Sequence, residues 1–182
     1  MRSIALRARE QWLNLTWAEA LTLLGCSVLL VASKWAGKIL EGTPGHSGAF
    51  WIPVLFLAVG SVRKPGGAGL TAFLGGAVWF GPRSGGGQLL SYVVAGLVLD
   101  AFGLNAERLR KLPFALLAGV VCHLAKFCIH NIPSALVGKA GGFALWGTEV
   151  TAGFHVLFGL IGGLVGWGIL NCVASRRSDG HA

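Results

Sequence analysis

The chain has 182 residues, of which 54% are hydrophobic and 12% are charged. Soluble domains carry about twice that share of charged residues, so the composition argues against a water-soluble globular protein and favours one domain embedded in a membrane. The formal net charge is +8, but the basic residues are dispersed between apolar runs, which favours a role in membrane topology over nucleic-acid binding.

Residues 1–15 form a basic, aromatic segment ahead of the first apolar run. Arginines followed by tryptophans predict a segment that lies at the membrane interface. A signal peptide also starts with basic residues, but here the apolar run continues past Lys34 without a clear small-residue cleavage site. We therefore expect this run to be retained as the first helix. The residues concerned are Arg2, Arg7, Arg9 and Trp12 of this segment, together with Trp17 at the start of the first expected span.

Six apolar runs follow one another along the chain. A helix needs about 20 residues to cross a bilayer, and shorter or longer helices are accommodated by thinning or tilt. The expected spans are residues 16–39, 48–63, 67–82, 87–104, 112–132 and 148–173. We predict an all-α integral membrane protein, in which residues 16–174 form a compact bundle of six transmembrane helices. A cytoplasmic tail is expected at 175–182.

Glycine and proline mark the joints of this bundle. The motif RKPGG at 63–67 predicts a tight turn between the second and third helices. In the sixth helix, Gly159/Gly163 and Gly162/Gly166 match GxxxG, a spacing that lets helix backbones approach closely. We expect these glycines to mark helix packing, either inside the bundle or on a partner.

The loops differ in their content of basic residues, and this difference sets the expected orientation. With a cytoplasmic N-terminus, the outer side receives Lys38, Arg83, Lys139 and Lys34. The inner side receives Arg2, Arg7, Arg9, Arg63, Lys64, Arg108, Arg110, Lys111, Arg176 and Arg177. The bias predicts that both termini are cytoplasmic.

A stripe of ionisable residues interrupts the fifth apolar run, in the stretch CHLAKFCIHN. At about 100° per residue, His123, Lys126 and His130 fall within an arc of about 60° on one helix face. At 1.5 Å per residue, His123 lies about 16 Å from the cytoplasmic end and His130 about 27 Å. Ionisable groups are costly in hydrocarbon, so this stripe predicts a cavity or polar partners.

Other polar and aromatic residues are expected at the same depth. The fourth and sixth helices and the loop at 40–47 all place such side chains in the outer half of the bundle. Apolar walls with a few placed polar groups are typical of small-molecule sites. The candidate substrate-binding residues are Lys126, His123, His130, His155, His46, Tyr92, Trp51, Asn131 and Glu149.

Several of these residues also have simpler interpretations. His130 and Asn131 are equally consistent with interfacial residues in contact with water, and His155 with an interhelical hydrogen bond. Asp100 lies deeper than the others, and we expect it to pair with a cytoplasmic-side arginine such as Arg108. The four cysteines form no CxxC pair and are expected to be buried free thiols. They are Cys26, Cys122, Cys128 and Cys172.

Two stretches carry a family resemblance. They are WIPVLFLAVGSVRKPGGAGLTAFLGGAVWFG, residues 51–81, and LLSYVVAGLVLDAFG, residues 89–103. Their apolar-Pro-apolar helix, RKPG turn and LLSG-like helix resemble the S components of energy-coupling factor (ECF) vitamin transporters, nearest to the thiamine or hydroxymethylpyrimidine type. The thiamine type has acidic residues in the helix after RKPG, where this sequence has Ala72, so we expect a neutral or anionic substrate rather than a cation.

The resemblance implies a multi-pass protein of a prokaryotic cytoplasmic membrane that captures a vitamin-like molecule from outside. It implies a membrane coupling subunit and two ATPase subunits as partners, and therefore neither an enzyme nor a cofactor on this chain. No GxxxxGK[ST] nucleotide motif occurs in the sequence. The expected partner face on the first helix comprises Ala18, Thr22 and Gly25.

Two alternatives remain open from the sequence. His46, His123, His130 and His155 are suitable ligands for nickel, cobalt or zinc, so the cargo of an uptake subunit could be a metal. A nearby lysine opposes a dication, and no HxH or HxxxH pair occurs. An intramembrane enzyme would use these groups as acid and base or Cys122 as nucleophile, but HExxH and GxSxG motifs are lacking.

Overall fold

The computed structural model describes residues 15–37, 43–62, 64–80, 86–104, 106–136 and 143–179. Side chains are described for these residues except 80, 86, 106, 130–136, 143–146 and 176–179. The helices are α2 (Trp17–Gly37), α3 (Gly48–Ser61), α4 (Gly67–Phe80), α5 (Gly86–Gly103), α6 (Ala106–Leu109), α7 (Leu112–Leu136) and α8 (Phe143–Asp179). The described residues contain no strand, so the prediction of an all-α fold is confirmed for them.

Each of the six predicted spans coincides with a helix, and α6 is an additional single turn. Within the described ranges, three segments are long and apolar enough to cross a membrane: Trp17–Gly37, Leu112–Ile129 and Gly147–Ser175. The segments Gly48–Ser61, Gly67–Trp79 and Gly87–Gly103 are apolar but shorter. The lengths and composition of these helices indicate a membrane protein.

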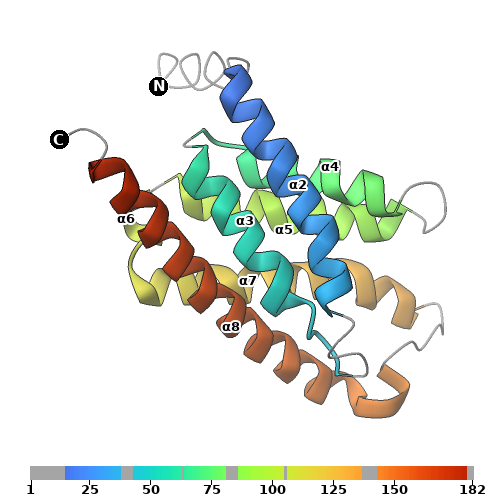
Figure 1. Cartoon of the computed structure of the whole chain (residues 1–182). Helices are drawn as coiled ribbons and strands as arrows, with labels where there is room; N and C mark the ends of the chain where they lie inside the picture. The colour runs from blue at the N-terminus through green and yellow to red at the C-terminus, as the bar shows by residue number, and fades with distance from the viewer. Residues whose placement is uncertain are drawn as a thin grey trace, which may run out of the picture.

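Helix α3 is the central element of the bundle. Figure 1 shows α3 between α2 on one side and α8 on the other. It also contacts α4, α5 and α7, while α5 packs between α4 and α7. The sequence of α3 is apolar around its whole circumference, and Trp51, Ile52, Leu55 and Phe56 are fully buried. A helix that is apolar all round is expected in the middle of a bundle.

Glycines allow α8 to approach both α7 and α3. A Cβ atom on Gly163 would lie 2.6 Å from the Ala115 carbonyl oxygen of α7. On another face of α8, a Cβ atom on Gly162 would lie 2.8 Å from the Gly48 carbonyl oxygen of α3. The two GxxxG patterns therefore mark packing inside the bundle, which decides between the two possibilities that the sequence left open.

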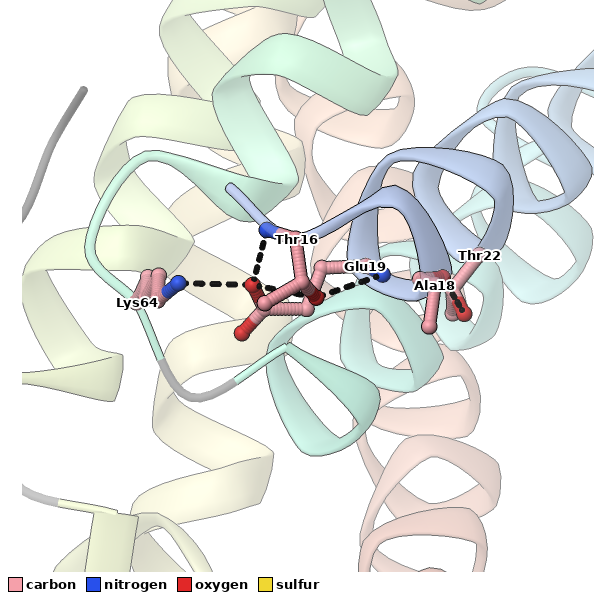
Figure 2. Close-up of polar contacts among 5 residues, drawn as sticks. All are labelled: Thr16, Ala18, Glu19, Thr22 and Lys64. Atoms are coloured by element: carbon pink, nitrogen blue, oxygen red, sulfur yellow. Dashed lines mark hydrogen bonds and ion pairs between the residues drawn. The ribbon is translucent and has the colours of Figure 1, made fainter. Parts of the chain in front are cut away.

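The N-terminus of α2 is closed by a capping box and tied to the turn before α4. Figure 2 shows Glu19 Oε2 accepting hydrogen bonds from the Thr16 backbone amide at 2.8 Å and from Lys64 Nζ at 2.6 Å. In return, Thr16 Oγ1 accepts a hydrogen bond from the Glu19 amide at 3.3 Å. The reciprocal bonds satisfy amides that a helix start leaves without partners. The RKPGG turn is confirmed, with Gly66 at φ 93°.

Asp100 of α5 caps the start of α4. Its Oδ1 accepts a hydrogen bond from the Ala68 amide at 3.0 Å, and its Oδ2 accepts one from the Gly69 amide at 2.8 Å. The partners that the structure gives to Asp100 are thus backbone amides, and the ion pair expected with Arg108 stays a prediction. A carboxylate at a helix N-terminus satisfies free amides and complements the helix dipole, so the α4 start is the better partner.

The four cysteines are free thiols, as expected, but only two of them are buried. Cys26 and Cys122 lie inside the bundle, whereas Cys128 and Cys172 are exposed. The expectation of burial was wrong for these two because their faces of α7 and α8 point away from the neighbouring helices. The outward face of a membrane helix is apolar, as is the face that packs inside the bundle. The hydropathy of the sequence therefore does not tell a buried cysteine from an exposed one.

Candidate functional site

Aromatic and histidine side chains from four helices meet in the interior, below the turn at 43–47. The Trp51 ring of α3 lies edge-to-face against Tyr92 of α5, with centroids 5.3 Å apart, and against His123 of α7 at 5.7 Å. His123 stacks on His155 of α8 at 4.6 Å. Phe127 of α7 also contacts the His155 ring, with centroids 4.5 Å apart. The structure thus brings together side chains that were expected, from their positions along the helices, to lie at a similar depth in the bundle.

The turn at 43–47 is fixed onto the histidine pair. His123 Nε2 lies 2.7 Å from the Gly45 carbonyl oxygen, and His155 Nδ1 lies 2.8 Å from the Thr151 carbonyl oxygen. Gly45 has a left-handed φ of 72°, and its Cβ would lie 3.0 Å from the His155 ring. Gly45 is therefore required both by its backbone conformation and by its closeness to the ring.

Two lysine amines lie against the same tyrosine ring. Lys126 Nζ of α7 lies 4.8 Å from the Tyr92 ring centroid and 5.9 Å from that of Trp51. Lys34 Nζ of α2 lies 4.0 Å from the Tyr92 centroid. Both distances are within the range of cation–π attraction. Lys34 was not among the predicted site residues, although a charged residue inside an apolar run was itself a signal of a site.

Two buried polar atoms of this cluster make no hydrogen bond within the described part of the chain. They are Trp51 Nε1 and His123 Nδ1, on side chains that are 0% exposed. Buried polar groups are normally hydrogen-bonded, so each orphaned atom requires an explanation. We call the set Trp51, Tyr92, His123, His155, Lys34 and Lys126 the lysine–histidine cluster.

Other predicted site residues lie elsewhere. His46 turns towards α2: its Nδ1 contacts the Thr43 carbonyl oxygen at 2.5 Å, and its ring lies beside Gly37. Glu149 is exposed near the start of the long part of α8, after the break at Gly147. The side chains of His130 and Asn131 lie outside those described.

The expected partner face on α2 points outward. Ala18 and Gly25 are exposed, Thr22 is half-buried, and a Cβ on Gly25 would meet nothing within 4 Å. The Thr22 hydroxyl donates to the Ala18 carbonyl at 2.7 Å, so it is satisfied within the helix (Figure 2). This face is thus open to contact with lipid or protein.

An apolar cavity of about 300 Å³ lies at the opposite end of α3 from the 43–47 turn, and Lys64 is one of its lining residues. Its walls come from α2, α4 and α5 and include Leu23, Leu70 and Leu97. Within the residues described, no group of three or more histidine, cysteine or acidic side chains could hold a metal ion.

No protein-family model matches the chain, and neither a curated protein nor a solved structure shows significant similarity to it. The function must therefore be argued from the geometry of the lysine–histidine cluster.

Proposed function

We propose that the chain is the membrane-embedded substrate-binding subunit of an ECF-type importer and captures a vitamin-like small molecule, neutral or anionic. The observation that carries this proposal is the lysine–histidine cluster. It gathers two amines, two imidazoles and two large aromatic rings inside an otherwise apolar helical bundle. Ionisable residues between membrane helices mark substrate paths by default, because burying them for stability alone is costly.

The proposal includes six membrane crossings with both termini in the cytoplasm. The turn at 43–47 and the turn at 64–66 lie at opposite ends of α3, and basic residues gather on the second side. With this orientation the cluster lies in the outer half of the bundle, under the 43–47 turn. The shorter helices α3, α4 and α5 would cross with local thinning of the bilayer.

The alternatives receive less support. The histidine rings stack at 29°, and one nitrogen of each ring already faces a backbone carbonyl oxygen, whereas a metal site needs converging ligands. For an enzyme, Cys122 is fully buried and makes no hydrogen bond to a described histidine. A nucleophile needs such a base within reach.

The experiment is native mass spectrometry of the full chain purified gently from its own membranes. We expect a retained organic molecule in the wild type and its loss in Lys126→Met. Lys111→Met is the matched control, because Lys111 is exposed and distant from the cluster. Co-purification of a coupling subunit with ATPases tests the importer part. A retained transition metal, or turnover of the bound molecule by the isolated chain, would contradict the proposal.

A further inference from the structure

A further cavity, of about 210 Å³, lies where the ends of several membrane helices meet. Its walls come from the last turn of α3, from the C-terminal part of α8 and from α6, which lies next to that part of α8 in Figure 1. The apolar segments Gly48–Ser61 and Gly147–Ser175 both end beside it. A cavity between the ends of membrane helices belongs to the surface of the bilayer, where the lipid headgroups are.

One acidic and one basic side chain line this cavity, Glu107 and Arg110. Both are exposed, and within the residues that the structure describes Glu107 forms no ion pair. Arg110 Nε donates to Asn171 Oδ1 at 3.5 Å, and the Arg110 carbonyl oxygen accepts a hydrogen bond from Trp167 Nε1 at 2.8 Å. The cavity therefore presents an anchored guanidinium and a carboxylate to the same occupant. Its other walls are apolar and include Val59, Leu109 and Leu170.

The surroundings of the cavity favour a lipid over a soluble molecule as this occupant. Tryptophans with a hydrogen-bonded ring N–H, such as Trp167, are typical of the boundary between membrane and water. Leu112 and Phe114 follow Arg110 closely in the chain and are exposed, which gives an acyl chain an apolar surface beside the charged residues. Sites that enclose a whole drug-sized ligand have volumes of about 300–1,000 Å³. The smaller cavity suits a headgroup whose chains stay outside.

We propose that this cavity binds the headgroup of a phospholipid that carries a primary amine, as phosphatidylethanolamine does. The planar guanidinium of Arg110 offers parallel N–H donors to two phosphate oxygens. The Glu107 carboxylate accepts a hydrogen bond from the ammonium group of the lipid. A choline headgroup has no N–H to donate, and a glycerol headgroup has no positive charge. This inference needs a chain that lies in a membrane, and it is independent of the importer function.

The test compares three phospholipids with identical acyl chains, whose headgroups are ethanolamine, choline and glycerol. The full chain, freed of lipid in detergent, is titrated with each of them, and bound lipid is counted by native mass spectrometry. We expect the ethanolamine lipid to bind about fivefold more tightly than the other two, the upper range for an exposed ion pair. Glu107→Gln should reduce this preference to less than about twofold.

Arg110→Gln should weaken the binding of all three lipids, because each of them carries the phosphate. Lys111→Gln is the matched control, since Lys111 is exposed and next to Arg110 but does not line the cavity. The thermal midpoint of each lipid-free variant monitors folding. Arg110→Lys keeps the charge without the planar fork, and it replaces the glutamine variant if that variant does not fold.

Equal binding of the three lipids, a preference for the glycerol lipid, or a preference that survives in both Glu107→Gln and Arg110→Gln would overturn the inference. Displacement of the lipid by an equal concentration of soluble phosphoethanolamine would assign the cavity to a free zwitterion and overturn it as well. We expect Lys126→Met to keep the lipid, because Lys126 does not line this cavity. Loss of the lipid in that variant would place it in the lysine–histidine cluster instead, so the two proposals can fail separately.

Discussion

The imidazole of His123 stacks on the imidazole of His155 with ring centroids 4.6 Å apart, which joins α7 to α8 in the interior of the bundle. The same His123 ring contacts the carbonyl oxygen of Gly45, so the turn before α3 is held at this junction as well. The walls of the lysine–histidine cluster therefore come from several helices and one turn.

The closeness of α3 to His123 predicts the effect of Gly48→Ala. A Cβ atom at this position would lie 2.6 Å from His123 Nε2, inside contact distance. We expect the free energy of unfolding to fall by about 1–3 kcal/mol, as in other overpacked interiors. Thermal unfolding in detergent measures this change. The control is Gly153→Ala on α8, where a Cβ meets nothing within 4 Å; equal destabilisation by both variants would contradict the described packing.

The α7–α8 interface predicts a similar difference between two glycines of α8. Gly163→Ala would place a Cβ 2.6 Å from the Ala115 carbonyl oxygen, and backbone cannot move aside as a flexible side chain can. We expect a loss of about 1–3 kcal/mol in unfolding free energy. Gly168→Ala adds a methyl group in open space and should be neutral or slightly stabilising, because alanine favours helix. A stable Gly163→Ala protein would show that the helices pack differently.

Capping of α4 by Asp100 can be tested with Asp100→Ala. Two hydrogen bonds to backbone amides would be lost, which leaves the amides of Ala68 and Gly69 without their acceptor. Loss of a cap costs about 0.5–2 kcal/mol, and we expect a fall in the thermal midpoint together with faster hydrogen exchange at the start of α4. Glu107→Ala, on an exposed residue, is the control. Unchanged exchange at the start of α4 would argue against the cap.

Two threonines provide a matched pair of isosteric changes. Thr71 is fully buried, and its hydroxyl makes no hydrogen bond within the described residues. Thr71→Val removes this unsatisfied group, so we expect a gain of about 1 kcal/mol in unfolding free energy. Thr151→Val instead removes a hydroxyl that donates to the Gly147 carbonyl at 2.7 Å, and should cost about 0.6 kcal/mol. If both valines shift the thermal midpoint in the same direction, the described difference between the two hydroxyls is wrong.

The elements of this fold were predictable because each apolar run ends at a local signal. The RKPGG turn separates α3 from α4, and the predicted start of the last span at 148 coincides with the break at Gly147. Depth along a helix also follows from counting residues, which is why His123, Lys126 and His155 were expected near one another. These inferences use only spacing along one helix at a time.

The parts that were missed depend on how helices rotate and pair. Lys34 was counted as an outer basic residue, yet its amine turns inward to Tyr92. Asp100 was assigned to an arginine close in sequence, whereas its partners are amides 31 and 32 residues away. Neither contact leaves a periodic pattern in the sequence, because both are set by how α2, α4 and α5 pack together.

The central position of α3 has a consequence for the dynamics of the protein. Because α3 contacts α2, α4, α5, α7 and α8, its backbone cannot open without separating most of the bundle. In hydrogen-exchange terms, the amides of α3 belong to the most stable cooperative unit and should exchange only through global unfolding. Trp51 therefore stands on the slowest-exchanging helix, while Lys34 and Lys126 stand on α2 and α7. Any motion that accompanies the proposed substrate binding would then leave α3 in place and displace the helices around it.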